Sequence, residues 1–218
     1  FKNGPFRKLC IATFLVFNSF QTIAAFSFFI IVHYLFMGDA SAASPWPTLH
    51  GSVGAIVTTF IVIPLVSKMA QTFGKKETFI ISQSISIIGY VLFWFLFIPG
   101  KPYMFLFALP FFAFGIGGLF TLMMSMTADV CDYEELQNGL PRKEGSFGAI
   151  YWWMVKLGTA LAGLLSGLIM WYVGFSPDAL SQPEGAMTGL RITYSTIPVL
   201  GTLFAIYIMS DYEIDESR

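Results

Sequence analysis

A single lysine, Lys156, interrupts a long apolar stretch that covers residues 147–173. A charge in the middle of a membrane helix costs about 2.5 to 3.5 kcal/mol, so such a residue usually has a function or a compensating partner. Helical spacing places Trp152 and Thr159 on the face of Lys156, and Trp153 beside it. An ammonium group beside an indole plane suits a ligand with hydroxyl groups and an apolar ring face, as sugars have. The alternative is a packing lysine that pairs with a carboxylate or with helix carbonyl groups.

Polar and small residues also form a stripe on the first apolar stretch. Asn18, Gln21, Thr22 and Ala25 follow the i, i+3, i+4, i+7 spacing of one helix face. This face is expected to line the interior of a helix bundle. Its polar groups serve either as substrate contacts or as hydrogen bonds between helices, and both interpretations stay open.

Charged residues are concentrated at the end of the fourth apolar stretch. Asp129 and Asp132 are three residues apart, so they share one helix face. Further charges follow at Glu134, Glu135, Arg142, Lys143 and Glu144. One interpretation is a solvated membrane interface. A second is a gate, in which these charges pair with a partner bundle in one conformation and separate in another. A third, binding of a diphosphate through Mg²⁺, requires a second aspartate cluster, which the sequence lacks.

The elements that position these residues are predicted from hydropathy. Hydrophobic residues make up 56% of the 218 residues and charged residues 11%, and the mean hydropathy is +0.70. A bilayer core needs roughly 20 apolar residues per helix. Six stretches meet this length, at residues 9–36, 51–73, 78–98, 103–127, 147–173 and 192–210. The sequence therefore predicts an all-α membrane protein with six transmembrane helices, and a loop from Met37 to His50.

The positions of lysine and arginine predict the orientation. Nine of these residues lie at one end of the predicted spans: Lys2, Arg7, Lys8, Lys68, Lys75, Lys76, Arg142, Lys143 and Arg218. The opposite end has Lys101 and Arg191 only. Because basic loops are retained inside, both ends of the chain are expected to be cytoplasmic and the protein to lie in the inner (plasma) membrane. A net charge of -1 offers no basic surface for nucleic acid. The acidic tail from Asp211 is interpreted as a solvated end.

Several short motifs resemble those of the glycoside-pentoside-hexuronide:cation symporters, the melibiose permease group of the major facilitator superfamily. They are M-x-A-D-x-x-D-Y at Met126 to Tyr133, R-x-E at Arg142 and Glu144, V-K-x-G at Val155 to Gly158, G-[FY]-x-P at Gly174 to Pro177, G-L-R at Gly189 to Arg191, and I-P at Ile197 and Pro198. The resemblance covers essentially the whole chain. It implies that residues 1–218 form the carboxy-terminal half of a transporter that has two six-helix bundles.

The resemblance also implies a site. The family's lysine on the fifth helix corresponds to Lys156, with Tyr151, Trp152 and Val155 nearby, and Phe120 is the match for an aromatic residue that stacks near the sugar. The cytoplasmic ion pairs of the family fit the gate interpretation of Asp129, Asp132, Arg142 and Glu144.

The expected function is therefore symport of a sugar or glycoside, without catalytic residues, bound metal or covalent cofactor. The coupling cation, Na⁺ or H⁺, is expected to have its ligands in the amino-terminal half, which is the expected partner in the bilayer. Two alternatives remain: transport of a non-sugar amphipathic solute, and a membrane enzyme that uses Asp129 and Asp132 with Mg²⁺ on a diphosphate.

Overall fold

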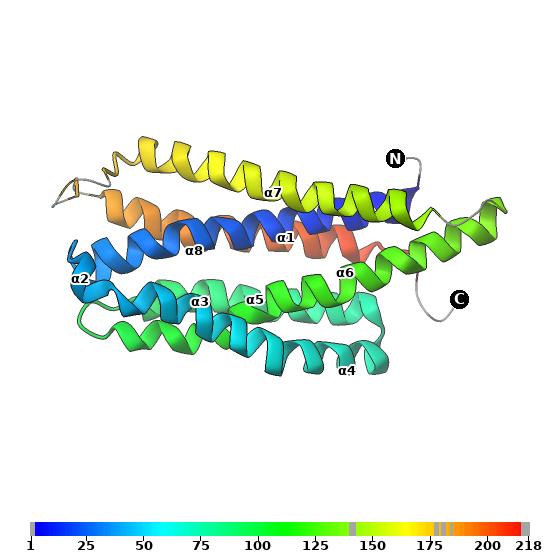
Figure 1. Cartoon of the computed structure of the whole chain (residues 1–218), viewed down its shortest axis with the longest axis horizontal. Helices are drawn as coiled ribbons and strands as arrows, with labels where there is room; N and C mark the ends of the chain where they lie inside the picture. The colour runs from blue at the N-terminus through cyan, green and yellow to red at the C-terminus, as the bar shows by residue number, and fades with distance from the viewer. Residues whose placement is uncertain (1–2, 140–142, 177–178, 180–181, 184, 215–218) are drawn as a thin grey trace.

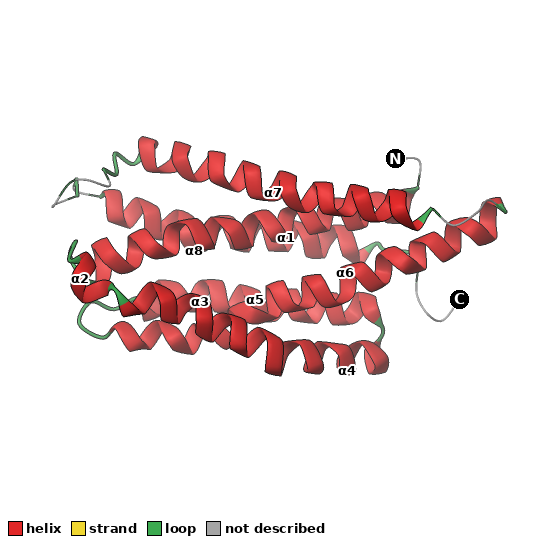
Figure 2. Cartoon of the chain, viewed as in Figure 1, coloured by secondary structure: helices red, strands yellow, loops and turns green. Residues whose placement is uncertain are grey.

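The computed structural model of the chain describes residues 3–139, 143–176, 179, 182–183 and 185–214. Within these residues Figure 2 shows helices and connecting loops, and no strand. Six helical segments, 22 to 36 residues long, are apolar enough to cross a bilayer. The shortest therefore reaches about 33 Å, enough for a hydrocarbon core about 30 Å thick. The predicted fold class, an all-α membrane protein with six spans, is confirmed.

Three of the six spans contain more than one helical element. The elements are α1 (Gly4–Phe29), η1 (Ile30–Leu35), α2 (Ala40–Ala43), α3 (Pro45–Val57), η2 (Thr58–Val62), α4 (Ile63–Phe73), α5 (Lys75–Leu96), η3 (Pro102–Ala108), α6 (Leu109–Asn138), α7 (Glu144–Tyr172) and α8 (Ala186–Ser210). The segments η1 and η2 are π-helical, and η3 is a 3₁₀-helix. π-Helical turns inside long helices are rare and occur frequently at functional sites. Here they interrupt the first and second spans.

The second span begins earlier than predicted. The sequence predicted a loop up to His50, whereas α3 begins at Pro45 and the single turn of α2 precedes it. Proline is compatible with the first turn of a helix, because its missing N–H has no partner there in any case. The Asp39 side chain caps α2 by accepting a hydrogen bond of 3.0 Å from the Ala42 backbone N–H. Most of the predicted loop is therefore helical.

The helix α1 lies at the centre of the bundle. It packs against α7 and α8 on one side and against α6 on the other, while α5 packs against α6 and α8. Figure 1 shows the two ends of the chain at the same end of the bundle as the junction of α4 with α5. That junction is a single residue, Gly74, whose φ of +85° favours glycine. The basic residues Lys75 and Lys76 follow it directly.

Aromatic rings fill the space between α5, α6 and α8. Phe93 on α5 lies 5.8 Å from Phe112 on α6 and 5.5 Å from Tyr194 on α8, measured between ring centroids. The backbones of α5 and α6 also approach closely, because a Cβ atom built on Gly89 would lie 2.5 Å from the Phe112 nitrogen. This tight interface fixes α6 against α5.

Candidate functional site

Lys156 lies on an uncovered face of α7. Its side chain is exposed, and no carboxylate among the described residues forms an ion pair with it. Trp152, one helical turn before it, is 46% exposed. Trp153 is 58% exposed. The ring of Trp152 faces α6, and its centroid lies 6.3 Å from the centroid of the Phe120 ring. The structure thus brings Lys156, Trp152 and Phe120 to one region.

Tyr151 and Val155 lie on the buried face of α7. Both are buried, and they pack in the core beside α1 with Leu9 and Cys10. These two side chains therefore do not share the uncovered face with Lys156. They fix the rotation of α7 about its axis, and this rotation is what exposes Lys156.

Asn18 connects α1 directly to α7. Its Nδ2 donates a hydrogen bond of 3.1 Å to the backbone oxygen of Gly158. The helices meet closely at this point, because a Cβ atom on Gly158 would lie 3.4 Å from the Phe14 oxygen. Of the two interpretations of Asn18, the structure therefore supports a hydrogen bond between helices. Gln21 is half-buried one turn further along α1.

A cavity of about 560 Å³ opens between α1, the second span and α6. Its walls are mostly apolar, with a few hydroxyl groups and one imidazole. The lining residues are Phe20, Ala24, Ser27, Phe28, Pro47, His50, Gly51, Gly54, Ala55, Thr58, Thr59, Phe112, Ile116 and Phe120. The π-helical segment η2 contributes Thr58 and Thr59 to this lining. Nothing in the sequence indicates this cavity, since hydropathy does not show which side chains of different helices face each other.

The predicted gate residues occupy the end of the bundle where the basic residues lie. Asp129 accepts hydrogen bonds of 2.7 and 2.8 Å from Lys75, the first residue of α5. The ion pair of Asp129 therefore lies within this bundle, whereas the gate hypothesis expected pairing with a partner bundle. Asp132 and Glu144 are exposed at the end of α6 and the start of α7. Arg142 lies outside the described residues.

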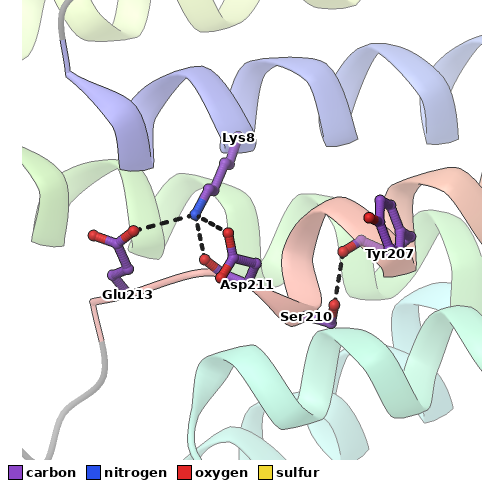
Figure 3. A network of polar contacts seen from close by, with 5 residues as sticks. All are labelled: Lys8, Tyr207, Ser210, Asp211 and Glu213. Carbon is purple, nitrogen blue, oxygen red and sulfur yellow. Dashed lines mark hydrogen bonds and ion pairs between the residues drawn. The ribbon is translucent and has the colours of Figure 1, made fainter.

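The first residues of the acidic tail pair with α1, and they are also solvated as predicted, because the side chains of Asp211 and Glu213 are 83% and 70% exposed. Figure 3 shows Lys8 of α1 between Asp211 and Glu213, and its Nζ lies 2.9 and 3.4 Å from their carboxylate oxygens. The same Nζ also donates to the backbone oxygen of Asp211. The hydrogen bond and the charge of Lys8 lower the pKa of the Asp211 carboxyl group. Nothing in the local sequence indicates this contact, because the partners are about 200 residues apart.

Arg191, which the sequence showed as part of the G-L-R motif and as one of the few basic residues at its end of the spans, joins three spans there. Its Nη1 donates to the Tyr34 hydroxyl group and its Nη2 to the Trp94 backbone oxygen, each at 2.8 Å. The guanidinium carbon lies 4.1 Å from the centroid of the Tyr34 ring and 4.5 Å from that of Trp94. Arg191 is thus stacked between two aromatic rings, a geometry that favours arginine over lysine.

The described residues contain no group of three or more His, Cys, Asp or Glu side chains that could hold a metal ion. The fold and the site together define a class: a multi-pass membrane protein whose helix bundle presents a polar residue in mid-span beside an aromatic cavity. The chain belongs to the family described as MFS/sugar transport protein, which matches residues 1–216. This confirms the predicted membership of the sugar transporters of the major facilitator superfamily. The family is one of transporters and not of enzymes, which decides against the enzyme alternative.

Several curated proteins are similar to the chain over most or all of its length. A glucuronide carrier protein homolog of Escherichia coli is 28% identical over 217 residues, which are 100% of this chain and 46% of that protein. A putative sulfoquinovose importer of the same species is 27% identical over 100% of this chain and 44% of that protein. A putative glycoside/cation symporter of E. coli is 26% identical over 78% of this chain and 36% of that protein. The chain thus spans less than half the length of these relatives.

Proposed function

We propose that the chain is the carboxy-terminal half of a secondary transporter, which moves a sugar or glycoside together with a cation across the inner membrane. The observation that supports this most directly is Lys156, which lies exposed in mid-span and has no carboxylate partner among the described residues. Such a charge needs a polar environment that this bundle does not supply. A cargo with hydroxyl groups, bound between two bundles, supplies it.

The proposed sugar site consists of Lys156, Trp152 and Phe120. The ammonium group donates hydrogen bonds to sugar hydroxyl groups, and the exposed indole of Trp152 packs on the apolar face of the sugar ring. Tyr151, Val155 and Asn18 act indirectly, because they hold α7 against α1 in the rotation that presents Lys156. Gln21, which is half-buried, is proposed to contact the cargo from α1.

The partner of this bundle is proposed to be an amino-terminal six-helix half. The relatives named above are more than twice as long as the chain, which supports this proposal. On α7, the pair Gly163 and Gly167 forms a G-x-x-x-G motif, and a Cβ atom at either position would meet nothing within 4 Å. Small residues at this spacing allow close packing of membrane helices. This part of α7 is therefore available to the other half.

Orientation and ion coupling complete the proposal. The ends of the chain and the loop before α5 lie at one end of the bundle (Figure 1), where the basic residues are concentrated. The positive-inside rule makes this end cytoplasmic. The coupling cation is proposed to be Na⁺ or H⁺, bound by carboxylates of the amino-terminal half.

The test is uptake by the full-length protein in proteoliposomes. Methyl glycosides of glucose, galactose and glucuronic acid are offered with and without an inward Na⁺ or H⁺ gradient. We expect gradient-dependent uptake of at least one glycoside, and its loss in Lys156→Ala. Lys101→Ala is the matched control, because Lys101 is an exposed lysine in a loop at the other end of the bundle. Equal uptake with and without a gradient contradicts symport, and full affinity of Lys156→Ala in direct titration contradicts the site.

A second cargo class is favoured by one observation, the largely apolar wall of the cavity. A non-sugar amphipathic solute, such as a lysolipid, would place its apolar part there. Uptake of a lysophospholipid but of no glycoside in the same proteoliposomes would support this second function over the first.

A further inference from the structure

An apolar groove lies between α7 and α8, apart from the sites described above. Its volume is about 390 Å³. The side chains that line it carry two polar atoms, the hydroxyl groups of Tyr172 and Thr193. The Thr193 hydroxyl group already donates to the Gly189 backbone oxygen of its own helix at 3.0 Å. The groove therefore offers almost no hydrogen bond to a ligand and suits a purely apolar one.

The groove exists because α7 and α8 both pack against α1 and make few contacts with each other. They meet closely at one end, where a Cβ atom on Gly189 would lie 2.8 Å from Cγ1 of Val173. The half-buried Ile169 lies at the floor of the groove, and the exposed side chains of Leu168 and Ile192 form its walls. The groove is thus a seam between two helices that share a neighbour.

The position of the groove along α7 matches one leaflet of a bilayer. It runs from Leu165 to Val173, which is about 12 Å at 1.5 Å per residue. One leaflet contributes about 15 Å of hydrocarbon. The helix ends at Tyr172, and Trp171 and Tyr172 are both strongly exposed, as aromatic residues at a membrane–water interface are. The groove therefore extends from the interface towards the middle of the bilayer, along the path that an acyl chain takes.

Helical geometry separates the groove from the face that carries Lys156. Leu165 follows Lys156 by nine residues, or two and a half turns, and Tyr172 follows it by about four and a half turns, so both lie on the opposite side of α7. Gly163 and Gly167 follow Lys156 by about two and three turns, so they share its side. That side is proposed to face the cargo and the amino-terminal half. The groove then faces the lipid.

We propose that this groove binds one acyl chain of a phospholipid from the leaflet in which α7 ends, with the glycerol and head group at the level of Trp171 and Tyr172. Membrane helices are held together by packing, because lipid is as apolar as their side chains. A chain in a concave groove contacts more protein atoms than a chain on a single helix face. The bound chain fills the seam and joins α7 to α8.

The side on which the other half packs is taken from the proposed function, but the cargo plays no part in this inference. Two other occupants, a second copy of this chain and the amino-terminal half, are outcomes that the test distinguishes.

The first experiment maps lipid contacts on the full-length protein. The proteoliposomes consist of phosphatidylethanolamine and phosphatidylglycerol, with a trace of phosphatidylcholine that carries a diazirine on one acyl chain. After illumination, the adducts are located by peptide mass spectrometry. We expect adducts on residues 165–173 and 189–193 to be at least about threefold more frequent, per exposed apolar residue, than on the face of α5 around Ile88 and Phe95, because only the groove surrounds the chain.

Filling the groove should remove this excess. Ile192 and Leu203 lie on the same helix and are each 47% exposed, but only Ile192 lines the groove. We expect Ile192→Trp to lower the adducts on residues 165–173 to the level of the α5 face, and the matched control Leu203→Trp to leave them unchanged. Leu168→Trp fills the groove from the other wall, so it should lower the adducts on residues 189–193 even if Ile192→Trp fails to fold.

The second experiment tests whether the bound chain joins the two helices. Thermal unfolding of the full-length protein is followed in detergent micelles with and without added phosphatidylethanolamine. A lipid that binds only the folded bundle raises Tm. We expect this rise to be the same in Leu203→Trp as in the wild type and to be smaller in Ile192→Trp. Equal rises in all three proteins contradict the stabilising role of the bound chain.

The remaining outcomes are distinct. Adducts in the groove that are no more frequent than on the α5 face show annular lipid only and overturn the site. Adducts that persist in both filling variants also overturn it, because the chain then lies elsewhere. A cross-link of Leu168→Cys to a second copy, or to the amino-terminal half, assigns the groove to that occupant; Cys10 and Cys131 are buried and do not compete. Absence of glycoside uptake overturns the proposed function and leaves the lipid groove in place.

Discussion

Replacing Arg191 should destabilise the bundle more than any other change to an exposed or half-buried polar residue described above. The side chain donates two hydrogen bonds of 2.8 Å and stacks between the rings of Tyr34 and Trp94. A hydrogen bond from a charged donor contributes about 1.5 kcal/mol at the low end, and a cation–π contact about 0.5 to 1 kcal/mol. Because membrane hydrogen bonds often contribute less, we expect Arg191→Ala to cost about 3 kcal/mol in the free energy of unfolding.

The assay is unfolding of the full-length protein from mixed micelles. Arg191→Lys keeps the charge but loses the planar fork, so its loss should approach that of Arg191→Ala. A double-mutant cycle with Tyr34→Phe isolates one hydrogen bond, because phenylalanine retains the ring and lacks the hydroxyl group; a coupling energy of about 1 kcal/mol is expected. Tyr172→Phe is the control, since that tyrosine is 84% exposed. Wild-type stability of Arg191→Ala, or a coupling energy near zero, would refute the reasoning.

Three further predictions concern helix packing and the cytoplasmic end. Gly89→Ala should cost about 1 to 3 kcal/mol of stability, because its Cβ would lie 2.5 Å from the backbone of α6. Gly145→Ala should cost nothing in thermal unfolding, since its Cβ meets nothing within 4 Å. Lys75→Ala and Asp129→Ala should each lower the free energy of unfolding. The loss in the double variant should be about 1 kcal/mol smaller than the sum of the two single losses, because both single changes break the same ion pair of 2.7 Å. Strictly additive losses would contradict this ion pair. The pKa of Asp211 is lowered by its lysine partner on α1, so this contact is present above the ordinary pKa of 3.8 and is lost as the pH falls below it. The protection factors of the Tyr212 and Glu213 amides, which correct for the slower intrinsic exchange in acid, should therefore fall on acidification, and in Asp211→Asn they should already be low at neutral pH.

Hydropathy predicts the number of spans because a bilayer sets one length for all of them. It does not predict where a helix ends in water, which explains why Pro45 and the capping residue Asp39 were assigned to a loop. The same limit applies to α6, which continues as far as Asn138, beyond the predicted end of its span at residue 127. Local capping groups and not the membrane boundary determine these helix ends.

The site was predictable only in part. Lys156 stands out because an intramembrane charge is rare, and the four-residue spacing to Trp152 is enough to place the two together. The rotation of α7 was not predictable, since Tyr151, Trp152 and Trp153 are all aromatic and only packing against α1 decides that Tyr151 is buried. The partners of Asp129 and Arg191 lie 54 and about 100 or more residues away, beyond any periodicity in the sequence.

The close contact of α1 with α7 and α8 also has a consequence for biosynthesis. Helices of a membrane protein leave the ribosome in sequence order, yet the first helix of this bundle packs mainly against the last two. The span of α7 has the lowest mean hydropathy of the six, 1.5, and contains Lys156, so it is the least able to stay in lipid alone. The Asn18 hydrogen bond to Gly158 gives this helix a binding site on α1 as it arrives. The first helix must therefore keep a polar face available during translation until the bundle can close around it.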